Sequence, residues 1–175
     1  MRAVAAMDTS IMPTAKERAL SHQRLLDLLD YDPATGIFRR KTGPRKGKIA
    51  GGDNGLGYLR IRVDGPKFFA SRLAWFYVHG EWPVEHVDHE NRHRACNIFS
   101  NLRPANRSQN NANSSLQPRN KFGIKYVYQR PCGTYRVQIK KDGKIHCIGS
   151  FNSLRAAEVA ARKAGEAMHG EFANV

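Results

Sequence analysis

The residues best suited to chemistry lie between positions 86 and 113, in the run HVDHENRHRACNIFSNLRPANRSQNNAN. Asp88 offers a carboxylate, a hard oxygen ligand, and the adjacent His89 offers an imidazole that accepts protons near neutral pH. Carboxamides downstream, including Asn110, add oxygens suited to one divalent cation such as Mg²⁺ or Mn²⁺. This set suits phosphodiester hydrolysis, in which a metal neutralises charge on the phosphate and an imidazole deprotonates water.

Each of these residues also has a simpler interpretation, because Asp-His pairs and Asn-rich turns are common in loops. Asp88 fits a turn residue, Asn101 a loop cap, and Asn110 an exposed helical amide. Order and spacing carry more information than composition. Asp88-His89 is followed by Asn101-Leu102, with the asparagine twelve residues after the histidine, and then by Asn110 nine residues further on.

This spacing resembles the His-Asn-His (HNH) endonucleases, in particular the phage and intron-associated branch with Asn in the third position. The similarity extends upstream through LLDLLDYDPATGIFRRKTG, GYLRIRVDG and SRLAWFYVHGEWP, so that it covers residues 21–113. The resemblance implies a ββα-metal unit, with Asp88 and Asn110 as metal ligands and His89 as the general base. It also implies that Asn101 holds the loop and orients His89.

One position in the loop departs from the family pattern. Arg92 stands three residues after the histidine, where the family usually has glycine, so an inactive descendant is the alternative. His86 is an auxiliary ligand or phosphate contact under this interpretation, and His93 belongs to the loop surface. The resemblance assigns contacts with flanking phosphates to the neighbouring arginines, namely Arg92, Arg94, Arg103 and Arg107.

The elements expected to position this segment are short. Ser21 caps a predicted amphipathic helix with leucines at 25, 26, 28 and 29, which ends at turn residues between 32 and 36. Strands are predicted at 37–40 and 58–63, the second with apolar residues alternating with arginines. Residues 71–79 form a predicted packing helix, and residues 1–20 are expected to be a flexible tail.

A second module is predicted after a polar linker at residues 114–121. Strand patterns at 123–128, 134–140 and 145–151 predict a three-stranded antiparallel sheet, and alanines at helical spacing after Ser153 predict a helix packed on it. The expected fold class is therefore α+β, with a nuclease domain at 21–113 and a DNA-binding domain at 122–175.

The second module resembles the APETALA or ethylene-response-factor type of DNA-binding domain, through QRPCGTYRVQI, DGKIHCIGSF and the final helix. That resemblance implies recognition by the sheet. Its groove-facing positions fall on Tyr128, Arg130, Arg136, Gln138 and Lys140. A solvated polar face is the alternative for this strand. Cys132 replaces a tryptophan common in the plant members, which puts their sequence specificity in doubt for this chain.

Composition agrees with a polyanion-binding protein. The 175 residues carry a formal net charge of +14. The excess of positive charge is spread along the chain. Residues 1–119 carry 19 basic and 11 acidic side chains, and residues 120–175 carry 10 basic and 4 acidic ones. No apolar run is long enough to span a membrane, and three scattered cysteines support neither a disulfide framework nor a zinc knuckle. A cytoplasmic protein is expected.

The favoured hypothesis is a site-selective, homing-type DNA endonuclease that nicks double-stranded DNA, acts as a monomer or weak dimer and has no evident protein partner. Its nuclease part is expected to retain some nicking without residues 120–175. A catalytically inactive DNA-binding regulator is the alternative, and an RNA-binding factor is a weaker one because the sheet lacks paired exposed aromatic residues.

Overall fold

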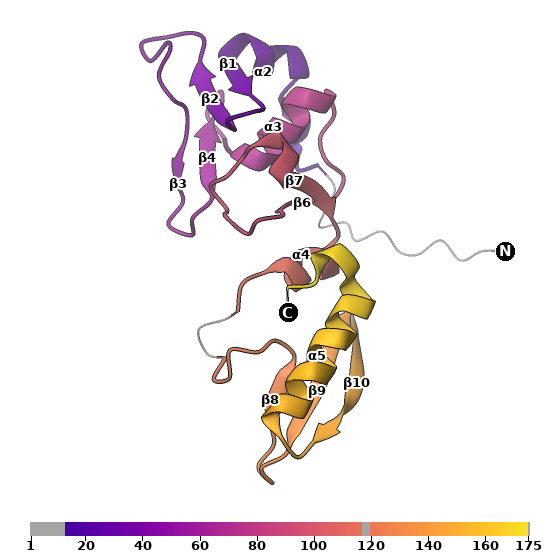
Figure 1. Cartoon of the computed structure of the whole chain (residues 1–175). Helices are drawn as coiled ribbons and strands as arrows, with labels where there is room; N and C mark the ends of the chain where they lie inside the picture. The colour runs from indigo at the N-terminus through magenta and orange to yellow at the C-terminus, as the bar shows by residue number, and fades with distance from the viewer. Residues whose placement is uncertain (1–12, 117–119, 175) are drawn as a thin grey trace, which may run out of the picture. The chain divides into compact units, whose positions relative to one another are not determined.

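The structure, a computed structural model, describes residues 13–116 and 120–174. The chain forms two compact units, the first ending at Pro104 and the second beginning at Ala105 (Figure 1). The expected linker at 114–121 belongs to the second unit, with residues 117–119 outside the described residues. The domain boundaries drawn from the sequence stay a prediction.

The first unit is built from short helices and small sheets. Its elements are α1 (Ala15–Ala19), α2 (His22–Leu28), β1 (Leu29–Asp32), β2 (Ile37–Arg40), β3 (Gly52–Asp53), β4 (Leu59–Arg62), β5 (Lys67–Phe69), α3 (Ala70–His79), β6 (His86–His89), η1 (Phe99–Asn101) and β7 (Leu102–Ala105). Strands β1 and β2 form an antiparallel pair, β3, β4 and β5 form an antiparallel sheet, and β6 is hydrogen-bonded to β7.

Helix α2 begins as the sequence predicts but ends earlier. The Ser21 side chain accepts a hydrogen bond from the backbone N–H of Arg24, as expected of an N-cap. The expected helix through Leu29 is wrong, because Leu29 begins β1 and pairs with Arg40 of β2. Leu29 and Tyr31 are buried and alternate with exposed aspartates, so the two-residue period of a strand replaces the helical one.

The core of the first unit gathers side chains of α3, of the sheet of β3, β4 and β5, and of α2 and the β1–β2 hairpin. Leu73 and Ala74 of α3 are fully buried, and Ile61 of β4 and Val63 beyond it are 1% exposed. Arg62 between them is exposed, so the alternation predicted for this strand is confirmed. Helix α3 ends at Gly80, whose φ of +74° is favourable only for glycine.

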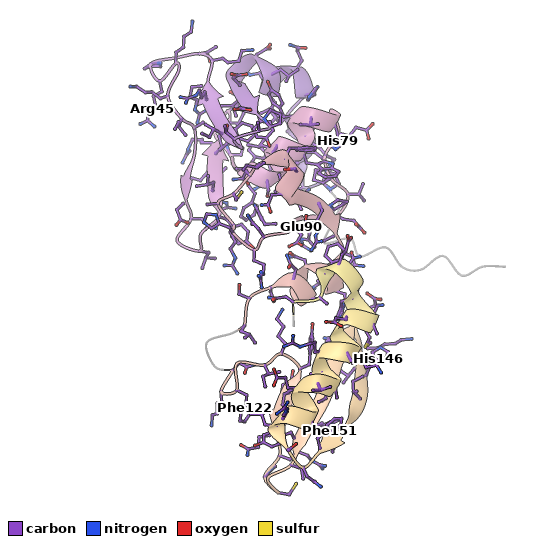
Figure 2. All side chains as sticks on the ribbon, in the orientation of Figure 1. Arg45, His79, Glu90, Phe122, His146 and Phe151 are labelled. Atoms are coloured by element: carbon purple, nitrogen blue, oxygen red, sulfur yellow. The ribbon has the colours of Figure 1, made fainter. Side chains whose placement is uncertain are left out.

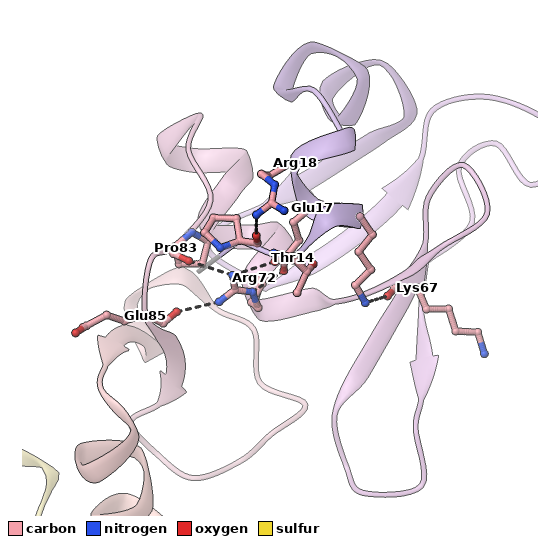
Figure 3. Close-up of polar contacts among 9 residues, drawn as sticks. Thr14, Glu17, Arg18, Lys67, Arg72, Pro83 and Glu85 are labelled. Carbon is pink, nitrogen blue, oxygen red and sulfur yellow. Dashed lines mark hydrogen bonds and ion pairs between the residues drawn. The ribbon is translucent and has the colours of Figure 1, made fainter. Parts of the chain in front are cut away.

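Helix α1 is fixed to α3 by a buried ion pair (Figure 3). Glu17 is 4% exposed, and its Oε1 accepts a hydrogen bond of 2.7 Å from Nε of Arg72. The Arg72 guanidinium also donates to the backbone oxygens of Pro83 and Glu85. Of the expected tail at residues 1–20, residues 15–19 are thus a packed helix, and residues 1–12 lie outside the described residues.

The second unit contains a short helix, a sheet and a long helix. Its elements are the end of β7, α4 (Arg107–Asn113), β8 (Val127–Gln129), β9 (Tyr135–Lys141), β10 (Lys144–Phe151), α5 (Leu154–His169) and η2 (Gly170–Phe172). The antiparallel order β10-β9-β8 confirms the predicted three-stranded sheet.

Helix α5 covers one face of this sheet. Ala157 and Ala161 of α5 pack with Val127 and Val137, all at most 5% exposed, and small alanines let the helix lie close to the strands. Ser153 caps α5 by accepting from the N–H of Ala156. The Phe122 ring, labelled in Figure 2, meets the Tyr135 ring edge-on with 5.6 Å between their centres. The mixed helix-and-sheet class is confirmed.

None of the helices in residues 13–116 and 120–174 combines the length and apolar character of a membrane span.

Candidate functional site

Asp88 and His89 end β6 and are both buried, at 5% and 4% exposure. The loop that follows runs from Glu90, labelled in Figure 2, to Asn101, just before β7. Asn101 closes it, because its backbone oxygen accepts from the N–H of Glu90 and its side-chain oxygen from the N–H of Asn91. Its amide nitrogen donates to the backbone oxygen of Cys96 at 2.8 Å. Asn101 therefore holds the shape of the loop that starts beside His89.

Asn97 forms a hydrogen bond with the imidazole of His89. The Nε2 atom of His89 lies 3.3 Å from Oδ1 of Asn97. The Asn97 amide nitrogen donates to the backbone oxygen of Ala95, which turns its oxygen toward the imidazole. An amide oxygen only accepts hydrogen bonds, so Nε2 carries the hydrogen and Nδ1 keeps its lone pair.

Burial is the main influence on the charge of this imidazole. It lowers the pKa of His89 below the ordinary value, and the bond to Asn97 and the charge of Asp88 only partly oppose that shift. His89 is therefore neutral at neutral pH, the form in which Nδ1 can accept a proton.

The hairpin of β1 and β2 supports Asn97 from behind. The Tyr31 hydroxyl donates to the backbone oxygen of Asn97 at 2.7 Å, and the backbone N–H of Phe99 donates to the oxygen of Pro33. Gly36 has a φ of +72°, and a Cβ on it would lie 2.3 Å from the backbone carbon of Asn97. The backbone of the loop thus rests directly on the hairpin turn.

Sequence reasoning missed Asn97, which is 2% exposed. It lies inside an irregular loop, where no periodic pattern marks a buried polar side chain. The one available signal was a polar asparagine flanked by apolar residues, in the run ACNIF at 95–99.

Aromatic and basic side chains lie on another side of His89. The Tyr58 ring is 6.0 Å from the imidazole ring, and the Arg94 guanidinium lies 4.9 Å from the centre of the Tyr58 ring. Arg94 also donates to the backbone oxygen of Leu56 at 2.9 Å. The structure thereby fixes Arg94 near the imidazole, and it adds Tyr58, which the sequence marked only as the start of a strand.

Arg103 and Arg92, expected to contact phosphates, have distinct local roles. Nε of Arg103 donates to Oδ2 of Asp88 at 3.2 Å, an ion pair between largely buried side chains. Arg92 is exposed and adopts a φ of +64°, the left-handed region in which glycine is favoured. Arg92, which stands where the family usually has glycine, therefore keeps the backbone conformation that glycine favours.

The remaining histidines of the segment differ in exposure. His86 is half-buried at the start of β6. His93 is exposed, and its backbone N–H donates to the side chain of Asn91 within the loop.

Asn110 and Arg107 belong to α4, in the second unit. Asn106 caps this helix, and its side chain and that of Gln109 each accept from the other's backbone N–H. Arg107 is exposed and Asn110 half-buried. The first unit thus brings together Asp88, His89, Asn97, Asn101 and Arg103. The role of Asn110 in this site stays a prediction.

The C-terminal sheet presents the predicted basic face. Val137 and Ile139 of β9 are fully buried, whereas Arg136 and Lys140 are exposed and Gln138 is half-buried. Tyr128 pairs with Arg136 in register and is 52% exposed. Arg130 follows β8 in the turn that its N–H closes on the Thr134 oxygen.

The residue types present, a buried carboxylate and amide oxygens, are those that a hard cation prefers. Among the described residues no three His, Cys, Asp or Glu side chains group as a metal cluster. One buried carboxylate, with amide oxygens, suits Mg²⁺, which binds proteins through one or two carboxylates and keeps several waters.

Residues 68–112 match a family model described as HNH endonuclease. This match includes Asp88, His89, Asn101 and Asn110, and it confirms the HNH resemblance for that segment. No curated protein and no solved structure matches the chain. Residues 68–112 are thus similar to HNH endonucleases, which indicates a nuclease or DNA-binding function.

Proposed function

We propose that this chain is a metal-dependent DNA endonuclease that hydrolyses one phosphodiester bond per encounter. The observation that carries the proposal is the neutral, buried His89 imidazole, which Asn97 orients beside the Asp88 carboxylate within a segment similar to HNH endonucleases. A neutral imidazole with a fixed tautomer is what a general base requires.

The reaction we propose begins with a proton transfer. Nδ1 of His89 accepts a proton from the attacking water while the water oxygen bonds to phosphorus. The bond from phosphorus to the 3′ oxygen breaks, and the leaving oxygen takes a proton from solvent. The products are a 5′-phosphate and a 3′-hydroxyl, as the HNH resemblance implies.

Asp88 and Asn110 are the residues proposed to hold one Mg²⁺ or Mn²⁺ ion. When bound, the ion supplies charge neutralisation on the phosphate and the leaving oxygen. Asn101 keeps the loop closed through its bonds to Asn91 and Cys96. The exposed Arg92, Arg94 and Arg107 contact flanking phosphates. For Arg103, the ion pair with Asp88 favours a local role over the phosphate contact expected from the sequence.

The C-terminal sheet is proposed to place the enzyme on double-stranded DNA. Arg136, Gln138 and Lys140 lie opposite the face covered by α5, and a row of such donors suits the major groove. Under this proposal the enzyme is site-selective and of the homing type. A monomer with one site nicks one strand.

Plasmid nicking tests the proposal. Supercoiled plasmid with Mg²⁺ or Mn²⁺ should become open circles, and His89→Ala should abolish conversion while retardation in gels stays nearly unchanged. His93→Ala is the matched control, because this exposed histidine lies four residues further along the same loop. Failure of the wild-type chain to nick plasmid or genomic DNA with any divalent metal would refute the nuclease.

A DNA-binding protein without nuclease activity is the second candidate. The Arg103 ion pair favours it, because a guanidinium on Asp88 neutralises the carboxylate proposed to bind metal. This candidate predicts salt-sensitive binding of duplex DNA without metal-dependent cleavage, so the same plasmid assay separates the two.

A further inference from the structure

Helix α4 has little intrinsic stability. It spans only seven residues, Arg107–Asn113, and three of them are asparagine, a weak helix former. Helices of this length are marginal in water even with alanine-rich sequences. The capping box of Asn106 and Gln109 satisfies backbone N–H groups at the start of the helix. The stability of the rest of the helix therefore depends on packing.

That packing comes from the end of the chain. Phe172 of η2 is 5% exposed and forms a buried cluster with Ala105 and Ala112, at 0% and 4% exposure. Ala105 precedes the cap of α4 and Ala112 lies in its last turn, so the Phe172 ring belongs to a buried cluster that includes residues near both ends of the helix.

Polar contacts from the same module hold the end of α4. The amide nitrogen of Asn174 donates to the backbone oxygens of Asn113 and Ser114, at 3.4 and 3.0 Å. The ammonium of Lys125 donates to the oxygen of Ala112, where a positive charge also complements the helix dipole. In the first turn, the Ser108 hydroxyl accepts from the backbone N–H of Asp142, in the turn between β9 and β10.

We propose that Phe172 is a positioning residue of the nuclease, and that the C-terminal module sets the orientation of α4 and of Asn110 on it. This inference rests on the proposed function, since it assigns Asn110 to the metal. It reverses the division of labour expected from the sequence: residues 120–175 become part of the catalytic apparatus as well as its DNA reader. Their loss should abolish nicking of any DNA, including non-specific substrate.

The test compares Phe172→Ala with Phe172→Leu in the full chain. Hydrogen exchange of the amides in residues 107–113 should accelerate about tenfold or more in Phe172→Ala, because the helix loses its packing partner. The rate constant of nicking at saturating DNA should fall by a similar factor, with KM and gel-shift affinity nearly unchanged. Phe172→Leu, which keeps an apolar side chain, should recover most of both.

Val137→Ala is the matched control. Val137 is fully buried in the same module, but it packs against α5 and not against α4. It should therefore leave exchange in residues 107–113 and the nicking rate near wild type. Unchanged exchange in Phe172→Ala, or an equal loss of rate in Val137→Ala, would overturn the inference.

The two proposals fail in distinguishable ways. A wild-type chain that never nicks DNA overturns the proposed function and with it any catalytic role of Phe172. The exchange measurement needs no activity, so it decides by itself whether Phe172 holds α4.

Discussion

At the residue scale, the chemistry proposed for His89 depends on Asn97. Asn97→Ala removes the acceptor on Nε2, so the imidazole loses its fixed tautomer and orientation. Single-turnover nicking should slow by about tenfold to a hundredfold while DNA affinity is kept. Ser100→Ala, an exposed change in the same loop, should have no effect. A wild-type rate in Asn97→Ala would remove Asn97 from the site.

The backbone conformation of Arg92 leads to a second prediction at this scale. Its φ of +64° disfavours any residue with a Cβ by about 1 kcal/mol. Arg92→Gly and Arg92→Ala both remove the charge, but only glycine relieves the backbone. Arg92→Gly should therefore unfold at a higher urea concentration than Arg92→Ala, by up to about 1 kcal/mol in free energy of unfolding. Equal stability would show that the backbone is not under strain.

At the scale of elements, the turn of the β1 and β2 hairpin is the critical contact with the loop. Gly36→Ala should destabilise the first unit by about 3 kcal/mol, because the new Cβ would overlap the backbone of Asn97. Gly43→Ala is the control, since Gly43 has a similar φ of +76° but nothing within 4 Å of its Cβ position. It should cost only about 1 kcal/mol. Thermal or urea unfolding measures both, and equal losses would refute the contact.

The ion pair between α1 and α3 makes stability depend on pH. Burial alone would raise the pKa of Glu17, but hydrogen bonds from Arg72 and Thr14 prevail and the pKa lies below its usual value of 4.5. Unfolded Glu17 therefore takes up its proton first, and this contribution is present above about pH 4.5 and lost as pH falls toward the folded pKa.

Arg72→Met should weaken this pH dependence, because the hydrogen bonds from Thr14 that lower the Glu17 pKa remain while those from Arg72 are lost. At neutral pH it should also lower the free energy of unfolding by about 3 to 5 kcal/mol, because it leaves the buried Glu17 carboxylate without the guanidinium that balances its charge. The exposed pair of Arg24 and Asp64 is the control, and Arg24→Met should barely change stability. Urea titrations at several pH values would contradict the prediction if both variants behaved alike.

Much of the fold can be predicted from sequence because its elements are periodic. The alternation around Val137 and the alanine spacing of α5 specify the C-terminal sheet and helix. Contacts between irregular segments leave no such pattern. Phe172 meets Ala112 across sixty residues, and Asn97 meets His89 inside a loop, so only folding reveals these partners. The sequence predicts a helix through Leu29 because four leucines in five positions also satisfy a helical period.

At the scale of the whole molecule, the net charge of +14 predicts strongly salt-dependent binding of DNA. Removing one positive charge that neutralises a phosphate, including that of a side chain in the groove, reduces the slope of log affinity against log salt concentration by about 1. Arg136→Ala or Lys140→Ala should show this reduction in gel-shift titrations. Lys163→Ala should not, because Lys163 is exposed on α5, which covers the opposite face of the sheet. Identical slopes in all three variants would assign DNA binding to another surface.

The support that Gly36 and Tyr31 give to Asn97 also limits how far the protein can be shortened. The segment similar to HNH endonucleases starts at residue 68, well after this hairpin, and stops before Phe172. A fragment cut to residues 68–112 would retain every side chain assigned to hydrolysis, yet lack both outside supports that keep those side chains in place. Transfer of the site into another scaffold would therefore also require the contacts that support it from outside residues 68–112.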